Sequence, residues 1–314
     1  MKAVIIGSSG HYGYTAGEIR RGNVEIAGIS VIPGEDIAPL AEFLGRLGVT
    51  AARYTSPEQM LEECDADIAI VNTRFDLNEQ YAASALGRGM SVFVEKPGAL
   101  GRVQAERLRT AYESAPGSPL LAAMYGIRYE APFVTAKRLI DEGSIGEIRL
   151  ISSQKSYKMG KRPEFYRRRE TYGGIISWVA CHALDWTRWF CGGEYTSVRA
   201  AASYACNRGN GDMEVTSALL CTLGENVIAT VTADMLRPEN SVTHGDDRAR
   251  IVGSEHILEI TGGKLYFDGG SVALDPPGDI FADMLRTLEN GAAPTADADE
   301  LFAICDAVSR AYGE

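Results

Sequence analysis

The first part of the chain alternates between short apolar runs and longer amphipathic stretches. The apolar runs are continuous, as in strands that a parallel sheet buries on both faces. The predicted strands are residues 2–7, 24–32, 66–73, 90–97 and 120–126. The predicted helices are residues 14–21, 39–48, 56–63, 78–89 and 102–115. This alternation predicts an α/β fold with a doubly wound parallel sheet.

The pattern changes after about residue 122, where strands follow one another through short glycine-rich turns. Such a run predicts a large, mostly antiparallel sheet. The predicted strands are residues 147–157, 195–205, 214–223, 226–235, 249–254, 256–263 and 264–270, and the predicted helices are 131–143 and 177–190. We therefore expect one domain over residues 1–122 and another over 123–314. Helices predicted in the C-terminal tail, from residue 280, could pack back on either domain.

Composition narrows the classes of function. The 314 residues carry a formal net charge of −11, which argues against general binding to nucleic acids or anionic membranes. No apolar run is long enough to span a bilayer. The six cysteines lack metal-ligand spacing, so we expect no metal site and interpret them as reduced thiols of a cytoplasmic protein.

A glycine-rich loop follows the first predicted strand and precedes a helix. Its spacing is GxxGxxG, with Ser9 in the slot that is commonly the second glycine. Glycines here permit a tight turn and let backbone amides approach a pyrophosphate. The alternative is a purely structural turn. The residues predicted to bind a dinucleotide are Gly7, Ser8, Ser9, Gly10, His11, Tyr12 and Gly13.

The acid that commonly binds the adenosine ribose is harder to find. Ser30 and Val31 stand at the end of the second predicted strand, where that acid is expected, whereas Glu35 and Asp36 come slightly later. The choice between NAD and NADP therefore stays open at this point.

Two further segments carry candidate catalytic groups. Glu95 and Lys96 end a predicted parallel strand, where open α/β sheets bind ligands, although the same residues would suit a solvated charge pair. His182 and Asp185 lie one helical turn apart in the apolar segment 173–186. Asp185 could orient His182 by a hydrogen bond, in a site or simply in the core.

Together these motifs resemble the glucose–fructose oxidoreductase, inositol dehydrogenase and MocA (Gfo/Idh/MocA) family, over nearly the whole chain. The resemblance implies a Rossmann domain followed by an α/β domain whose open sheet often forms oligomers, here a dimer or tetramer. It implies hydride transfer between NAD or NADP and a secondary alcohol or ketone of a sugar, polyol or sugar acid. The residues that match family positions are Lys96 and His182 as catalytic groups, and Asn72 and Thr73, with Glu95 and Lys96, as cofactor contacts. Asn78 stands where a histidine is common.

One position departs from the family pattern, because Trp178 replaces an aspartate four residues before His182. In the expected chemistry His182 is the base, Lys96 stabilises charge on the substrate oxygen and Asp185 assists. The departure keeps a second reading open, a dinucleotide-binding sensor without turnover. A semialdehyde dehydrogenase is a third reading, but its nucleophile Cys181 adjoins His182 and points elsewhere on a helix.

A basic segment spans residues 155–170 of this acidic protein. Its cations are Lys155, Lys158, Lys161, Arg162, Arg167, Arg168 and Arg169. They could attract an anionic substrate, or they could belong to a solvated loop or an oligomer contact.

Overall fold

A computed structural model describes residues 1–292 and 296–314 of the chain. The chain forms two compact units. The first comprises Met1–Met124 and Asp279–Phe302, and the second comprises Tyr125–Gly278 and Ala303–Glu314. The first break lies between Met124 and Tyr125, and the segment from Asp279 returns to the first unit.

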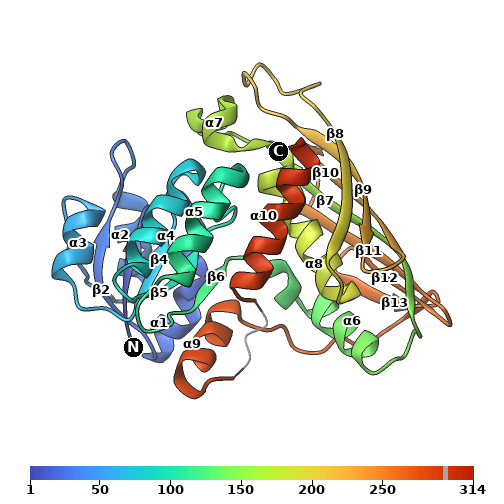
Figure 1. Ribbon diagram of the computed structural model, residues 1–314, viewed down its shortest axis with the longest axis horizontal. Coiled ribbons are helices and arrows are strands. Elements are labelled where there is room, and N and C mark those ends of the chain that lie inside the picture. Colours follow the sequence, from blue (N-terminus) through green and yellow to red (C-terminus); the bar gives the residue numbers. More distant parts are fainter. Residues whose placement is uncertain (293–295) are drawn as a thin grey trace. The chain divides into compact units, whose positions relative to one another are not determined.

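The first unit contains a six-stranded parallel sheet in the order β3-β2-β1-β4-β5-β6 (Figure 1). Its strands are β1 (Lys2–Ile6), β2 (Glu25–Ser30), β3 (Ala52–Arg53), β4 (Ile68–Val71), β5 (Ser91–Val94) and β6 (Leu121–Ala123). The strand order reverses between β1 and β4, the kind of switch point at which such sheets bind ligands. The two-residue strand β3 is too short and too exposed to leave an apolar run, and the sequence did not predict it.

Helices connect these parallel strands. They are α1 (Ala16–Arg21), α2 (Ala38–Arg46), α3 (Pro57–Glu63), α4 (Asn78–Leu86) and α5 (Gly101–Glu113), with short 3-10 turns at Tyr12–Thr15 and Phe75–Leu77. Helix α9 (Ile280–Asn290) joins this unit from the far end of the chain. Its Phe281 packs against Phe93 of β5, with ring centroids 5.2 Å apart, so the returning segment completes the core of the first unit.

The second unit contains an eight-stranded sheet in the order β14-β13-β12-β11-β7-β10-β9-β8. Its strands are β7 (Ile148–Lys158), β8 (Tyr195–Ser203), β9 (Thr216–Leu223), β10 (Val227–Arg237), β11 (Gly245–Gly253), β12 (Ile257–Thr261), β13 (Lys264–Phe267) and β14 (Gly270–Ser271). Strands β7 and β10 pair in parallel and the other neighbours pair antiparallel. The predicted parallel sheet followed by a mostly antiparallel one is confirmed.

Helices α6 (Ala131–Asp141) and α8 (Cys181–Cys191) cover one face of the large sheet (Figure 1). Shorter turns at Gly126–Tyr129 and Glu164–Arg167, helix α7 (Arg169–Tyr172) and part of α10 (Ala298–Tyr312) also belong to this unit. Side chains on the other face, such as Leu220 and Ile228, are exposed. Within the described ranges, each helix is too short or too polar to cross a bilayer.

The predicted single helix over 177–190 is wrong in one respect. Residues Ile176–Ala180 form a π-helical turn, and α8 begins only at Cys181. A π turn closes its hydrogen bonds over five residues and not four, so the regular α-helical register holds only from Cys181 onward. This turn follows Gly173 and Gly174, both at positive φ.

Candidate active site

The glycine loop lies at the carboxyl ends of three neighbouring parallel strands. The Gly7 amide donates to the carbonyl of Ser30 at 2.8 Å, which ties the loop to β2. The Ser9 amide donates to the carbonyl of Asn72, just after β4, at 2.9 Å. The loop therefore spans the switch point of the sheet, where the sequence predicted a dinucleotide site.

Gly7 and Gly10 are required by close packing within the chain. A Cβ atom at Gly7, whose φ is +85°, would lie 2.5 Å from the carbonyl oxygen of Asn72. A Cβ at Gly10 would lie 2.7 Å from both Asn72 Oδ1 and Glu95 Oε2. A Cβ at Gly13 would meet nothing within 4 Å, so open space lies beside the third glycine.

Asn72 offers polar atoms that the described chain does not use. The residue is fully buried, and neither its Nδ2 nor its Oδ1 has a hydrogen-bond partner among the described residues. Buried amide groups are nearly always paired, so an unpaired one beside a glycine loop is suited to a polar ligand. Together with the cradle of Gly7 and Gly10, this side chain fits a dinucleotide.

Glu95 fixes the middle of the glycine loop. Its Oε2 accepts hydrogen bonds from the His11 amide at 2.6 Å and the His11 Nδ1 at 2.8 Å. Burial disfavours the ionised carboxyl, but His11, through its charge and hydrogen bonds, together with Lys96 holds the pKa of Glu95 below its usual value. The ring of Tyr12 packs on Phe43 of α2, with centroids 5.0 Å apart.

Glu35 also reaches the glycine loop. Its carboxylate accepts hydrogen bonds from the Ser8 amide at 3.1 Å and from Ser9 Oγ at 2.5 Å. Burial raises its pKa above the usual value. The segment after β2 folds back over the loop, so an acid that comes late in the sequence contacts two residues of the loop.

Asn78 links the segment that follows β4 to the segment that follows β5. Its Nδ2 donates to the carbonyls of Glu95 and Pro97, each at 3.0 Å, and its Oδ1 accepts from Thr73 Oγ1 at 2.8 Å. Asn78 therefore braces the backbone on both sides of Lys96, whose side chain is only 1% exposed. The sequence marked Asn78 only as a departure from the family pattern.

In the second unit, His182 is buried near the start of α8. Its ring meets Tyr125 edge-on, with centroids 6.3 Å apart. Burial raises the pKa of Tyr125 well above its usual value, so this phenol stays neutral beside the imidazole. Tyr125 lies two residues after the end of β6, and the sequence analysis did not single it out.

Asp185 has a partner that the sequence did not indicate. Its two carboxylate oxygens accept hydrogen bonds from the buried guanidinium of Arg128, from Nε at 3.0 Å and from Nη2. A bidentate pair of this kind is rigid because both ions are shielded from water. We therefore treat Asp185 as the counter-ion of Arg128 and as a positioning residue for α8.

Trp178 lies within a cluster of aromatic rings. Tyr157, Tyr166 and Tyr172 have ring centroids 5.6, 5.1 and 6.2 Å from it, and the Arg162 guanidinium stacks on it at 4.8 Å. The indole thus packs with β7 and with the segment before α8, where the family pattern has a small acid.

Much of the basic segment is engaged within the second unit. Lys155 pairs with Asp247, and Arg169 pairs with Glu214 at 2.9 Å. Arg162 donates to the carbonyl of Lys158. These contacts favour a structural role for most of the segment, and the expectation that it recruits an anionic substrate stays a prediction.

Two family models match this chain, one in its first part and one in its second. Residues 1–118 match the model described as "Oxidoreductase family, NAD-binding Rossmann fold", and residues 133–259 match the "GFO/IDH/MocA C-terminal domain". An inositol 2-dehydrogenase of Salmonella typhimurium is 24% identical over 183 residues, which are 58% of this chain and 52% of that protein. The chain spans about half the length of the curated relatives it matches.

Solved structures match over nearly the whole chain. A putative oxidoreductase from Thermotoga maritima has 38% identity and a TM-score of 0.95, covering 99% of this chain and 97% of that one. GenD2 from gentamicin A biosynthesis, solved in complex with NAD, shares the fold with 18% identity and a TM-score of 0.80, covering 99% and 93%. This chain belongs to the Gfo/Idh/MocA oxidoreductase family, and its first unit is that family's NAD-binding Rossmann fold.

Proposed function

We propose that the protein is an NAD-dependent dehydrogenase that acts on a secondary alcohol, or in reverse on a ketone, of a sugar-like substrate. The observation that carries the proposal is the glycine cradle beside the unpaired, buried amide of Asn72, in a chain that retains both Lys96 and His182. Relatives named inositol 2-dehydrogenase support a polyol or sugar as the substrate class.

Each side chain of the proposed site has a separate role in the reaction. His182 takes the hydroxyl proton in the oxidative direction and returns it in the reductive direction, an effect typically worth about 10²–10⁴ in rate. Lys96 donates a hydrogen bond to the same substrate oxygen and stabilises its developing negative charge. Asn78 holds the backbone around Lys96, and the pair of Arg128 and Asp185 holds α8. The nicotinamide, when bound, accepts or returns the hydride.

We further propose that Glu35 selects NAD over NADP. A carboxylate hydrogen-bonded to the Ser8 amide and the Ser9 hydroxyl can accept from a ribose 2′-hydroxyl. The same carboxylate would repel a 2′-phosphate, which carries negative charge.

A substrate screen tests the proposal. Sugars, polyols, amino sugars and sugar acids are incubated with the protein and either NAD or NADP, and the absorbance of the reduced nicotinamide is followed. We expect turnover with at least one compound, and with NAD in preference to NADP. Tight NAD binding without turnover of any compound would favour the alternative, a sensor in which Trp178 occupies the position of the family acid.

We also propose that the protein works as a cytoplasmic homo-oligomer. All six cysteines are free thiols, which suits a reducing compartment. The exposed face of the eight-stranded sheet bears apolar side chains such as Leu220 and Ile228, which a second copy of the chain could cover.

A further inference from the structure

A cavity of about 490 Å³ lies on the helix-covered face of the large sheet. The start of α6, with Glu130 and Phe133, forms one wall, and strands β7 and β11, with Lys155 and Asp247, form another. Its volume falls in the range of small-molecule sites. The cavity is lined by residues of the second unit, so it is defined by that unit alone.

Lys155 and Asp247 form a buried ion pair inside this cavity. Lys155 Nζ lies 2.6 Å from Asp247 Oδ2, and the lysine side chain is only 2% exposed. The ammonium also lies 4.5 Å from the ring centroid of Tyr157. The positive charge of Lys155 is therefore already matched within the chain, and little of it remains to attract an anion.

The other oxygen of Asp247 remains available. Oδ1 is buried and has no hydrogen-bond partner among the described residues. Burial raises the pKa of Asp247. Glu130 is exposed at the cavity mouth, and partial desolvation together with the charge of Asp247 raises its pKa. Lys155 opposes both shifts without cancelling either, so neither carboxyl group is fully compensated within the chain.

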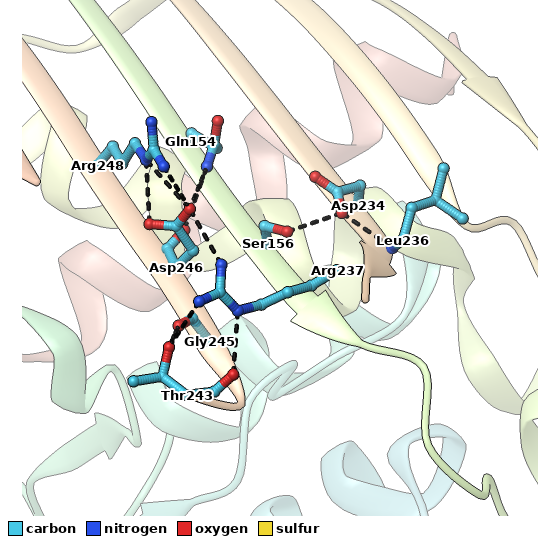
Figure 2. Close-up of polar contacts among 9 residues, drawn as sticks. All are labelled: Gln154, Ser156, Asp234, Leu236, Arg237, Thr243, Gly245, Asp246 and Arg248. Atoms are coloured by element: carbon cyan, nitrogen blue, oxygen red, sulfur yellow. Dashed lines mark hydrogen bonds and ion pairs between the residues drawn. The ribbon is translucent and has the colours of Figure 1, made fainter. Parts of the chain in front are cut away.

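A second pair at the edge of the cavity is also matched internally. Figure 2 shows Arg237 held by Thr243 and Asp246: Nε and Nη2 donate to the carbonyl and hydroxyl of Thr243, and Nη1 lies 3.2 Å from Asp246 Oδ2. Asp246 is bound in addition by Arg248 at 2.7 Å. Arg237 is therefore committed to the turn before β11 and to Asp246.

The charges of the lining decide what the cavity can accept. The lining holds three carboxylates, Glu130, Asp246 and Asp247, against two cations, Lys155 and Arg237. After the two internal pairs are formed, the Glu130 carboxylate and the free Oδ1 of Asp247 remain. Both accept hydrogen bonds, so a ligand must supply donors.

From this geometry we propose that the cavity binds the protonated amino group of a hydroxylated, sugar-like ligand, with Asp247 Oδ1 and Glu130 as its acceptors. The ring of Tyr157 and the apolar wall of Phe133 and Ile260 offer flat carbon surface to the ligand frame. Tyr157 also packs on Trp178, which belongs to the segment that leads to His182. Asp247 on β11 and Glu130 before α6 would then supply acidic groups in place of the aspartate that the family has at the position of Trp178. This inference rests on the proposed function and deepens it, because it names the class of substrate.

Direct binding measurements test the inference without requiring catalysis. Calorimetry on the full chain, with and without NAD, compares glucosamine, glucose and glucuronate, which share a pyranose frame and differ in charge. We expect glucosamine to bind about tenfold or more tightly than glucuronate, with glucose between them. Asp247→Asn and Glu130→Gln should each reduce the preference for glucosamine over glucose several-fold.

Glu259→Gln is the matched control. It makes the same change of acid to amide on the opposite face of the sheet, where Glu259 pairs with Arg250, and should leave the ranking unchanged. Thermal unfolding of each variant verifies folding.

Any one of four results would overturn the inference. The three compounds bind with equal affinity, glucuronate binds most tightly, none of the three binds measurably, or neither cavity variant alters the order of affinities. If the ranking holds while no compound is turned over with NAD, the proposed function fails and the cavity assignment stands. If a compound is turned over while the ranking is flat, the proposed function stands and the cavity assignment fails.

Discussion

Several single side chains of this protein link segments that are separate in the sequence. Glu35 is the clearest case, because it follows β2 by several residues and still reaches the Ser8 amide and the Ser9 hydroxyl. A sequence pattern gives the distance along the chain and not the path of a loop, so the contact could not be predicted. Asn72 and Lys96, in contrast, were predicted as cofactor-side residues from motifs alone, and their roles stay predictions.

Replacing Glu35 with glutamine should change the cofactor preference. Glu35→Gln removes the negative charge near the expected 2′-position and keeps a hydrogen-bonding side chain, so NADP affinity should rise about tenfold relative to NAD. Calorimetric titration with both dinucleotides measures the ratio. Asp36→Asn is the control, because the Asp36 carboxylate accepts from the Ala38 amide and only the backbone carbonyl, which the substitution keeps, contacts the loop. An unchanged ratio in Glu35→Gln would remove Glu35 from the cofactor site.

Asp185→Asn should destabilise the second unit strongly. The change leaves the buried Arg128 guanidinium without its carboxylate, a loss of about 3–5 kcal/mol in the free energy of unfolding. Urea denaturation measures it. Glu42→Gln, in the exposed pair with Arg46, should cost less than about 1 kcal/mol. A cost at Asp185 no larger than at Glu42 would show that the buried pair is not structural.

Among the elements, the segment before α8 depends on tertiary contacts. Glu214 Oε2 accepts from the Ile175 amide at 3.1 Å, the Tyr312 hydroxyl accepts from the Ile176 amide at 3.1 Å, and Arg169 pairs with Glu214. Glu214 and Tyr312, from two distant parts of the chain, thus hold the start of the π turn. Periodicity predicted the helix that follows, but it could not predict the turn, because its cause lies outside the segment.

The basic segment gives an element-scale prediction. Arg169→Gln should lower the free energy of unfolding by about 1–3 kcal/mol, because it leaves Glu214 without its charged partner. Arg168→Gln, at the exposed neighbouring position, should change it by less than about 0.5 kcal/mol. Chemical denaturation of the two variants compares them. Equal effects would contradict a structural role for Arg169.

At the scale of the whole molecule, continuous apolar runs that alternate with helices predicted the parallel sheet, because a parallel sheet is buried on both faces. Consecutive strands joined by short glycine-rich turns predicted the mostly antiparallel sheet. The strand order and the return of α9 to the first unit could not be predicted in this way, because they depend on packing between distant segments. The cavity with Lys155 and Asp247 was missed for the same reason, since its residues are remote in sequence.

The open sheet face supplies a prediction about assembly. Leu220→Glu places a charge on the exposed face of β9 and should shift an oligomer toward the monomer, because burying an unpaired carboxylate is costly. Analytical ultracentrifugation measures the distribution of masses. Val103→Glu adds the same charge at an exposed position of α5 in the first unit and should leave the distribution unchanged. Identical distributions for wild type and Leu220→Glu would exclude this face as the interface.

We propose that Lys96 and His182 serve one dehydrogenation reaction in a protein that binds NAD. The most direct measurement compares turnover and NAD affinity in Lys96→Met and His182→Ala, using a substrate found in the screen. We expect each variant to lose about 10²-fold or more in the catalytic constant while calorimetry shows NAD affinity nearly unchanged. Turnover that survives both substitutions at the wild-type rate would contradict it.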